Sequence, residues 1–251
     1  MEFPMTSTNK KSIVWLGVYG HPDDETSASA GTMVKLSDEG HQVFVITATG
    51  GELGTLGTDG TKIRREDLAS VRESELRANM KAYGANPPFM LRYVDQELEK
   101  EDPEVLAIKI LDIMHMVKPN VVSTFGPSGI SNHPDHIAIH ISTLIAYEKY
   151  TNPTSENAPL LIYPSIPEDI AKMYNLQLSP VEKNMDLIID INETIGYKIE
   201  GLKNYKSQED AQEFAAHLSE REGSHFESFA VSDSSPNDWE SHPVVKYLRS
   251  L

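Results

Sequence analysis

The sequence of this 251-residue chain alternates between short apolar, β-branched runs and segments of helical periodicity. Strands are expected at residues 13–19, 43–47, 89–94, 121–125, 160–163 and 187–191. Helices are expected at residues 27–39, 65–83, 103–117, 135–150, 192–205 and 210–220, with stop signals at Gly40, Gly84 and Pro119. Such alternation favours a mostly parallel sheet with helices on both faces. The sequence therefore predicts an α/β protein with a Rossmann-like, doubly wound fold.

The tripeptide His-Pro-Asp occurs twice, each time shortly after a predicted strand. Residues 21–25 read His-Pro-Asp-Asp-Glu, and residues 133–136 read His-Pro-Asp-His. Mixed nitrogen and oxygen ligands suit zinc, and three protein ligands with an open fourth position are typical of a hydrolytic site. Iron, cobalt or manganese could fill the same ligand set.

The predicted topology brings the two motifs together. In a common doubly wound order, the first and fourth strands are neighbours at the point where the order reverses, and ligands bind outside their carboxyl ends. His21 follows the first strand, and His133 lies a short loop beyond the fourth. The two motifs are therefore expected to face each other across one crevice.

The spacing within the motifs suggests a division of roles. His21 and Asp24 are three residues apart, so both side chains can point to one side of a helical first turn, which leaves Asp23 free to act as a base. One of His133 and His136 can complete a metal site while the other stabilises an oxyanion. A bound zinc lowers the pKa of its water to about 7, which suits hydrolysis of an amide or ester.

Simpler interpretations of these residues exist. His-Pro-Asp could form only a turn, and Asp135 is expected to cap the helix that follows it. His136 and His140 have the spacing of a metalloprotease helix, but Ile137 stands where that helix needs glutamate, so His140 is expected to be a helix-packing or surface histidine. The remaining histidines lack ligand-spaced partners and are most simply surface or satisfied polar residues.

Composition excludes several classes of protein. The formal net charge is −16, and a negative surface repels phosphate backbones, so no nucleic-acid partner is expected. The chain has no cysteine, which excludes disulfides and a cysteine nucleophile. No apolar run approaches the about 18 residues of a membrane-spanning helix, and no secretory cleavage pattern follows residues 1–11. A cytoplasmic protein is therefore expected.

The chain is similar to the zinc-dependent de-N-acetylase family, which includes N-acetylglucosaminyl-phosphatidylinositol de-N-acetylase (PIG-L) and the LmbE-like bacterial enzymes. The His-Pro-Asp-Asp-Glu motif of that family is complete at residues 21–25. The second motif, Gly-His-Pro-Asp-His, is present with Asn132 in place of glycine, and the family's Asp-Gly-x-Leu stretch has Gln96 in place of glycine. The resemblance covers roughly the first 150 residues, with weaker traces at residues 207–208 and 227–229.

This resemblance implies a role for each motif residue. Zinc would be bound by His21, Asp24 and His136. Asp23 would be the general base, and His133 would stabilise the oxyanion and protonate the leaving amine. Two further residues, Arg72 and Asp95, would contact the sugar or a phosphate of the substrate.

The resulting hypothesis is a metal-dependent hydrolase that removes the N-acetyl group from an N-acetylglucosamine-type sugar or conjugate by attack of zinc-bound water. An amidase acting on a larger thiol-sugar or another acylated metabolite, and a non-catalytic metal-binding protein, are the alternatives. We expect one domain over residues 1–251, in which residues 12–150 carry the motifs and residues 151–251 complete the sheet and the substrate pocket. The segment 151–159 is expected to be a surface loop, the glycine-rich segment 50–60 is either a lid or a wide turn, and a homo-oligomer is left open.

Overall fold

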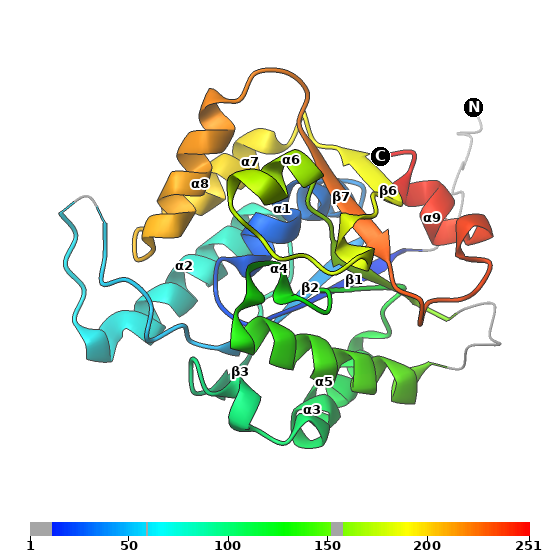
Figure 1. Cartoon of the computed structure of the whole chain (residues 1–251), viewed down its shortest axis with the longest axis horizontal. Coiled ribbons are helices and arrows are strands. Elements are labelled where there is room, and N and C mark those ends of the chain that lie inside the picture. Colours follow the sequence, from blue (N-terminus) through cyan, green and yellow to red (C-terminus); the bar gives the residue numbers. More distant parts are fainter. Residues whose placement is uncertain (1–11, 59, 152–157) are drawn as a thin grey trace, which may run out of the picture.

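The computed structural model describes residues 12–58, 60–151 and 158–251. Within these residues, one sheet of seven strands has the order β3-β2-β1-β4-β5-β7-β6 (Figure 1). The strands are β1 Val14–Tyr19, β2 Gln42–Thr49, β3 Phe89–Tyr93, β4 Val121–Thr124, β5 Leu160–Pro164, β6 Leu187–Asp190 and β7 Phe226–Val231. Strands β1 to β5 pair in parallel, whereas β7 runs antiparallel to both β5 and β6.

Helices cover both faces of this sheet. They are α1 Asp24–Asp38, α2 Leu68–Ala82, α3 Pro103–Val117, α4 Gly129–Asn132, α5 Pro134–Tyr150, α6 Glu168–Met173, α7 Ile195–Asn204, α8 Glu209–Glu220 and α9 Pro243–Leu248. Helices α3 and α5 pack together on one face, and α1 packs with α7 on the other, where α2 and α8 also lie against α7 (Figure 1). None of the helices in the described part of the chain is long and apolar enough to cross a membrane.

The mostly parallel, doubly wound architecture predicted from the sequence is confirmed. Strand β1 lies between β2 and β4, with Leu16 opposite Phe44 on one side and Val122 on the other. Because β1 is central and covered on both faces, its side chains form a nearly unbroken apolar run, and Trp15 and Leu16 are fully buried. The order reverses between β1 and β4, as expected, and their carboxyl ends lie side by side.

One strand was missed. The prediction has six strands, whereas β7 enters the sheet between β5 and β6 as a seventh. Its sequence, Phe-Glu-Ser-Phe-Ala-Val, carries a glutamate and a serine, so it lacks the apolar run by which the other strands were recognised. Both polar residues are nonetheless buried in the fold. The short helices α4, α6 and α9 were also not predicted, since none is long enough to show helical periodicity.

The C-terminal part of the chain completes the sheet, because β5, β6 and β7 all lie beyond residue 158. Most of the surface loop expected at residues 151–159 falls on residues 152–157, which lie outside the described residues. The same holds for the polar N-terminal residues 1–11.

Candidate metal centre and active site

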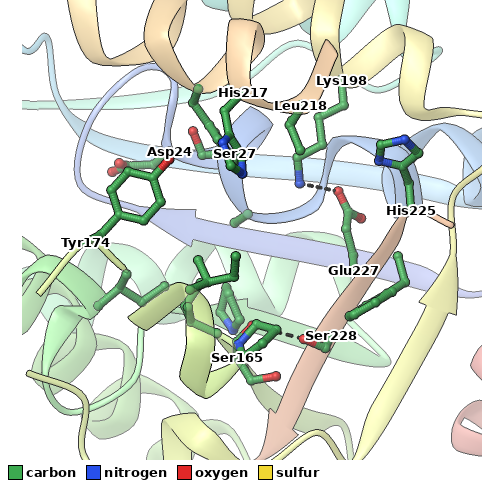
Figure 2. A pocket seen from close by; sticks show the side chains of 18 of the residues that line it. Asp24, Ser27, Ser165, Tyr174, Lys198, His217, Leu218, His225, Glu227 and Ser228 are labelled. Atoms are coloured by element: carbon green, nitrogen blue, oxygen red, sulfur yellow. Dashed lines mark hydrogen bonds and ion pairs between the residues drawn. The ribbon is translucent and has the colours of Figure 1, made fainter. Parts of the chain in front are cut away.

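A cavity of about 340 Å³ opens at the end of the sheet where β1, β4 and β5 finish (Figure 2). Asp24 and Ser27 of α1 and His136 of α5 border it at one end. From there it extends between α7, α8 and the start of β7, where Lys198 and Glu227 lie. Residues from both ends of the chain therefore share one cavity at the predicted switch point of the sheet.

The first motif adopts a tight turn between β1 and α1. Asp23 has a left-handed backbone with φ of 101°, and its N–H donates to the carboxylate of Glu25 at 3.0 Å. The N–H of His21 donates to Oδ2 of Asp24 at 2.8 Å. These bonds point the side chain of Asp24 toward His21 and that of Asp23 away from it. The spacing of the motif predicted this arrangement of the three side chains.

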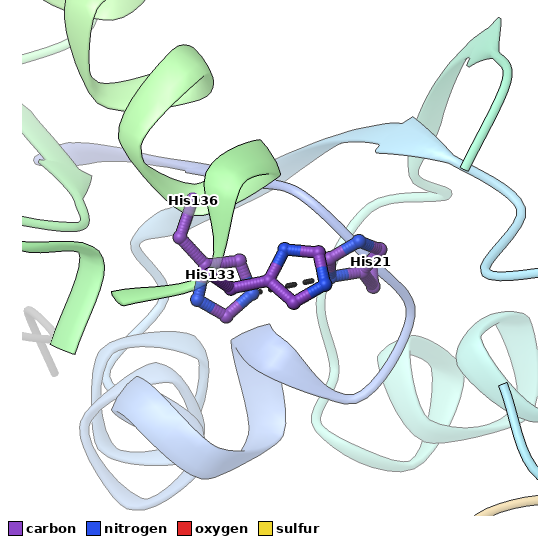
Figure 3. A group of neighbouring side chains, drawn as sticks. All are labelled: His21, His133 and His136. Atoms are coloured by element: carbon purple, nitrogen blue, oxygen red, sulfur yellow. Dashed lines mark hydrogen bonds between the residues drawn. The ribbon is translucent and has the colours of Figure 1, made fainter. Parts of the chain in front are cut away.

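Three predicted metal ligands converge across the crevice. Nδ1 of His21 lies 3.1 Å from Nε2 of His136 and 3.5 Å from Oδ2 of Asp24. Nε2 of His136 lies 3.4 Å from Oδ1 of Asp24. Figure 3 shows His136 reaching from the start of α5 to His21 in the loop after β1. In a tetrahedral zinc site with bonds of about 2.0–2.1 Å, neighbouring donor atoms are roughly 3.3 Å apart. The observed spacings fit such a site.

Hydrogen bonds on the far side of each imidazole leave the facing nitrogens free to bind a cation. Nδ1 of His136 donates to the carbonyl of Gly129 at 3.0 Å, so Nε2 carries the lone pair. Nε2 of His21 lies 3.1 Å from Asp95 and 3.2 Å from Asp135, and donating there leaves the lone pair on Nδ1. Two lone pairs 3.1 Å apart repel unless a cation or a proton lies between them. Carboxylate and carbonyl partners of this kind commonly orient histidine ligands of metals.

Two other groups of these side chains also bring potential ligand atoms together. Nitrogens of His21, His133 and His136 lie within 4.8 Å of one another, as do ligand atoms of His21, Asp95 and Asp135. Both oxygens of Asp135 already accept backbone N–H groups, from Gln96 at 2.7 Å and Leu98 at 3.1 Å. Asp135 is therefore better placed to orient His21 than to bind the metal itself.

The electrostatics of the site favour a cation. Burial lowers the pKa of His21, but hydrogen bonds to Asp135, Asp24 and Asp95 outweigh it and hold that pKa well above its usual value. Burial raises the pKa of Asp24, and here the neighbouring His136 and His21 outweigh it and bring the pKa well below its usual range. A positive charge at the centre of this group is thus stabilised from several sides.

Asp23 is paired with Arg72 rather than with the three ligands. The guanidinium of Arg72 donates to Oδ2 of Asp23 at 2.7 Å and also to the carbonyls of Pro22 and Gly51. Burial raises the pKa of Asp23 well above its usual value, although Arg72 acts in the opposite direction. The result is a buried carboxylate that is more basic than one on the surface and is fixed in orientation.

His133 is oriented by its own helix. It is the N-cap of α5, and its Nδ1 accepts the N–H of Asp135 at 3.1 Å. Asp135 was expected to be this cap, but His133, two residues earlier, takes that place because Pro134 begins the helix. With Nδ1 as acceptor, the neutral imidazole of His133 must carry its proton on Nε2. Burial, together with His21 and His136, lowers the pKa of His133, so the neutral form is favoured.

The two predicted substrate contacts lie behind the ligands. Arg72 is only 4% exposed and Asp95 only 3%. Oδ2 of Asp95 also accepts the N–H of Leu53 at 2.8 Å, and its Oδ1 faces His21. Their hydrogen bonds are therefore with the motif residues and the adjacent loop, and their binding of substrate stays a prediction.

Both departures from the family's motifs occur at left-handed backbone positions. Asn132 and Gln96 each have φ of 60°, a conformation that glycine adopts without strain. Asparagine tolerates it better than most residues, whereas glutamine pays a larger steric penalty. A left-handed backbone thus explains the glycines of the family's motifs at these two positions. This chain has that left-handed backbone with asparagine and glutamine in place of glycine.

The glycine-rich segment after β2 lies against Arg72. A side chain on Gly51 would place its Cβ 2.2 Å from a guanidinium nitrogen of Arg72, and Gly51 also has φ of 63°. The carbonyls of Glu52 and Gly54 accept hydrogen bonds from Arg65. The close approach of Arg72 and the left-handed backbone therefore account for glycine at residue 51. Whether residues 50–60 form a lid stays a prediction, and Asp59 lies outside the described residues.

Sequence analysis did not single out the residues that line the far end of the cavity. Lys198 and Glu227 form a buried ion pair of 2.8 Å there (Figure 2). In the sequence, Glu227 is only part of a weak trace of the family at residues 227–229, although a glutamate within a segment that contains Phe226, Phe229 and Val231 is a signal that could identify it. His140, by contrast, packs as expected, with Nδ1 donating to the carbonyl of Phe125 at 2.8 Å.

Comparison with curated proteins finds relatives with two kinds of activity. A 1D-myo-inositol 2-acetamido-2-deoxy-alpha-D-glucopyranoside deacetylase of Kineococcus radiotolerans is 29% identical over 187 residues, which are 64% of this chain and 51% of the relative. A mycothiol S-conjugate amidase of Streptomyces coelicolor is 31% identical over 150 residues, 53% of this chain and 51% of the relative. The chain thus spans about half the length of these two proteins.

Other relatives match over most of their length. A probable N-acetyl-alpha-D-glucosaminyl L-malate deacetylase 2 of Bacillus cereus is 30% identical over 197 residues, 78% of this chain and 84% of the relative. Among solved structures, the N,N'-diacetylchitobiose deacetylase of Pyrococcus horikoshii has the same fold, with a TM-score of 0.68 at 20% identity, over 98% of this chain and 92% of that one.

The family described as GlcNAc-PI de-N-acetylase matches residues 16–147, which include both His-Pro-Asp motifs and more than half of the chain. The ligand geometry, the relative that matches over most of its length and this family match agree, and the chain belongs to the PIG-L family of GlcNAc-PI de-N-acetylases.

Proposed function

We propose that this protein is a zinc-dependent N-deacetylase that removes the acetyl group from an N-acetylglucosamine-type amino sugar or its conjugate. The observation that carries this proposal is the convergence of His21, Asp24 and His136 within 3.1–3.5 Å of one another. The names of the deacetylase relatives support the substrate class.

When bound at these three ligands, zinc would supply Lewis-acid chemistry, because it polarises the amide carbonyl and lowers the pKa of a water molecule to about 7. Asp23 accepts the proton of the attacking water at its carboxylate. Arg72 holds that carboxylate in place through the 2.7 Å hydrogen bond. The same carboxylate then returns the proton to the nitrogen of the leaving amine.

His133 stabilises the oxyanion through Nε2–H. The backbone N–H of Asp135 occupies Nδ1, so Nε2–H is the donor that remains available. Because the pKa of His133 is lowered, the imidazole is neutral and acts by donating a hydrogen bond. Proton delivery to the leaving amine is therefore assigned to Asp23 rather than to His133, which revises the role that the family resemblance implied for this histidine.

The decisive test combines a substrate panel with metal analysis. The zinc-loaded protein should release acetate from N-acetylglucosamine linked to inositol, to malate or to a methyl group. Asp23→Asn should retain the metal and lose activity by about 10²-fold or more. His136→Ala should lose both metal and activity, whereas the exposed His115→Ala should keep both. Hydrolysis by Asp23→Asn at the parent rate would contradict these roles.

A second candidate is an amidase acting on a larger thiol-sugar amide, which the amidase relative favours. It uses the same residues, and it predicts cleavage of the larger amide with little acetate release from the panel. A non-catalytic protein would bind the metal and cleave neither. The cytoplasmic location is proposed on the sequence analysis alone.

A further inference from the structure

The cavity beside the metal ligands has more room than an acetyl group requires. A methyl group is about the size of a water molecule, whose share of liquid volume is roughly 30 Å³. The cavity measures about 340 Å³. For comparison, an apolar cavity of about 150 Å³ in another protein binds benzene.

Its walls are largely apolar and come from several elements. The apolar side chains along it include Phe125, Ile130, Ile166, Ile170, Ile195 and Phe214. Several of these are only partly buried, so the fold leaves part of their apolar surface open to the cavity. Covering such surface with an apolar ligand is favourable, at about 25 cal/mol for each Å² removed from water.

The charged pair at the far end does not call for a charged ligand. Nζ of Lys198 donates to Oε1 of Glu227 at 2.8 Å, and this carboxylate also accepts the N–H groups of Gly31 at 3.1 Å and Thr32 at 2.8 Å. The hydroxyl of Thr32 donates to it as well, at 2.6 Å. The charge of Lys198 is thus matched within the protein. Besides Asp24 and His136, further titratable side chains line the cavity, among them Asp210, His217, Arg221 and His225, and the apolar side chains supply most of its wall.

The position of the cavity relative to the base decides which part of a substrate enters it. Asp24 and His136 line the cavity, whereas Asp23 and His133 do not. The leaving nitrogen must lie near Asp23 to receive a proton, and the carbonyl oxygen must lie near the metal ligands and His133. The remaining substituent of the carbonyl carbon, the acyl chain, then points into the cavity.

From this arrangement we infer that the cavity is an acyl pocket, and that the enzyme hydrolyses N-acyl amino sugars with chains longer than acetyl in preference to N-acetyl ones. This inference rests on the proposed function and extends its substrate class from N-acetyl to longer N-acyl amino sugars. Medium-length, unbranched and uncharged acyl chains fit the apolar walls and the volume.

A chain-length series tests the inference. Methyl glycosides of glucosamine carrying N-acetyl, N-butanoyl or N-hexanoyl groups are compared by kcat/KM with the zinc-loaded enzyme. Each methylene buried in the pocket should raise kcat/KM about fourfold, until the chain fills it. The octyl glycoside of N-acetylglucosamine, which lengthens the other side of the amide, should gain much less.

Two matched variants locate the effect. Ile170→Trp places a larger side chain in the wall of the cavity and should lower the hexanoyl-to-acetyl ratio of kcat/KM by at least about tenfold. Ile188→Trp makes the same change on β6, where the side chain is 52% exposed and outside the cavity, and should leave the ratio unchanged. Calorimetry provides a readout other than turnover: Asp23→Asn should bind the N-hexanoyl substrate more tightly than the N-acetyl one, with a more negative heat-capacity change.

The outcomes separate the two proposals. The inference is supported if kcat/KM is higher for the longer acyl chains and Ile170→Trp abolishes this preference. If the acetyl compound is cleaved and longer acyl chains are cleaved progressively more slowly, the inference is overturned and the proposed function stands. The same holds if kcat/KM rises for the octyl glycoside and not for the longer acyl chains. Failure of the metal-loaded enzyme to cleave any of these amides overturns both.

Discussion

The guanidinium of Arg72 donates a hydrogen bond of 2.7 Å to the carboxylate of Asp23, and both side chains are buried. This bond joins α2 to the turn after β1. It places a positive charge directly beside the proposed base. The contact indicates that Arg72 positions Asp23 and tunes its basicity.

Replacing Arg72 should therefore change the pH profile of the reaction. Arg72 lowers the pKa of Asp23, so Arg72→Met should raise that pKa and move the acidic limb of kcat/KM to higher pH, since Asp23 acts as a base only when ionised. Arg72→Lys keeps the charge and should shift the limb less. Arg77→Met on the same helix is the control. If the acidic limb of Arg72→Met does not move and its KM rises, the result would instead support the predicted contact of Arg72 with substrate.

Asp135 should contribute to metal affinity without binding the metal. Its carboxylate lies 3.2 Å from Nε2 of His21 and is fully buried. Asp135→Asn weakens the partner that orients His21, and the dissociation constant for zinc should rise by roughly 10- to 100-fold. Competition with a chromophoric chelator measures this. Asp112 is exposed on α3, and Asp112→Asn should leave the zinc affinity unchanged. Equal zinc affinities in the two variants would show that Asp135 does not contribute to metal binding.

Glu227 should be important for stability. It accepts hydrogen bonds from Gly31 and Thr32, just after a kink at Ser29 in α1, and pairs with buried Lys198. Glu227→Gln leaves the ammonium without its counter-charge, so the free energy of unfolding should fall by about 3–5 kcal/mol in urea titrations.

The double variant Lys198→Met/Glu227→Gln measures how much of that loss of stability comes from breaking the ion pair. It should recover part of the lost stability, because it removes the uncompensated charge. Additive effects of the two substitutions in a double-mutant cycle would show that the pair is not coupled.

His140 should make stability depend on pH. Burial lowers the pKa of His140 below its usual value of about 6.5, so the unfolded chain takes up this proton more readily than the folded one. Its contribution is fully present above about pH 6.5 and is lost as the pH falls toward the folded pKa. His140→Asn should flatten the decline in unfolding free energy between about pH 7 and pH 5. Parallel declines for both proteins would exclude this residue as a cause.

The sequence by itself determined the order of most of the elements and the place of the predicted metal ligands. Apolar runs mark β1, β2, β4 and β5 because buried strands in the parallel part of the sheet have no polar face. The two His-Pro-Asp motifs follow strands that a doubly wound sheet makes neighbours. The convergence of His21, Asp24 and His136 follows from that topology and from a three-residue spacing.

Only the tertiary structure decided which groups surround these ligands. Arg72 as partner of Asp23, Asp135 as partner of His21 and the tautomer of His133 all depend on contacts between residues distant in sequence or on the geometry of a helix cap. Glu227 obscures the seventh strand in the sequence because it is charged, whereas in the fold it is buried in that strand and paired with Lys198. Local patterns encode periodicity, whereas the pairing of buried polar groups is settled only when distant segments meet.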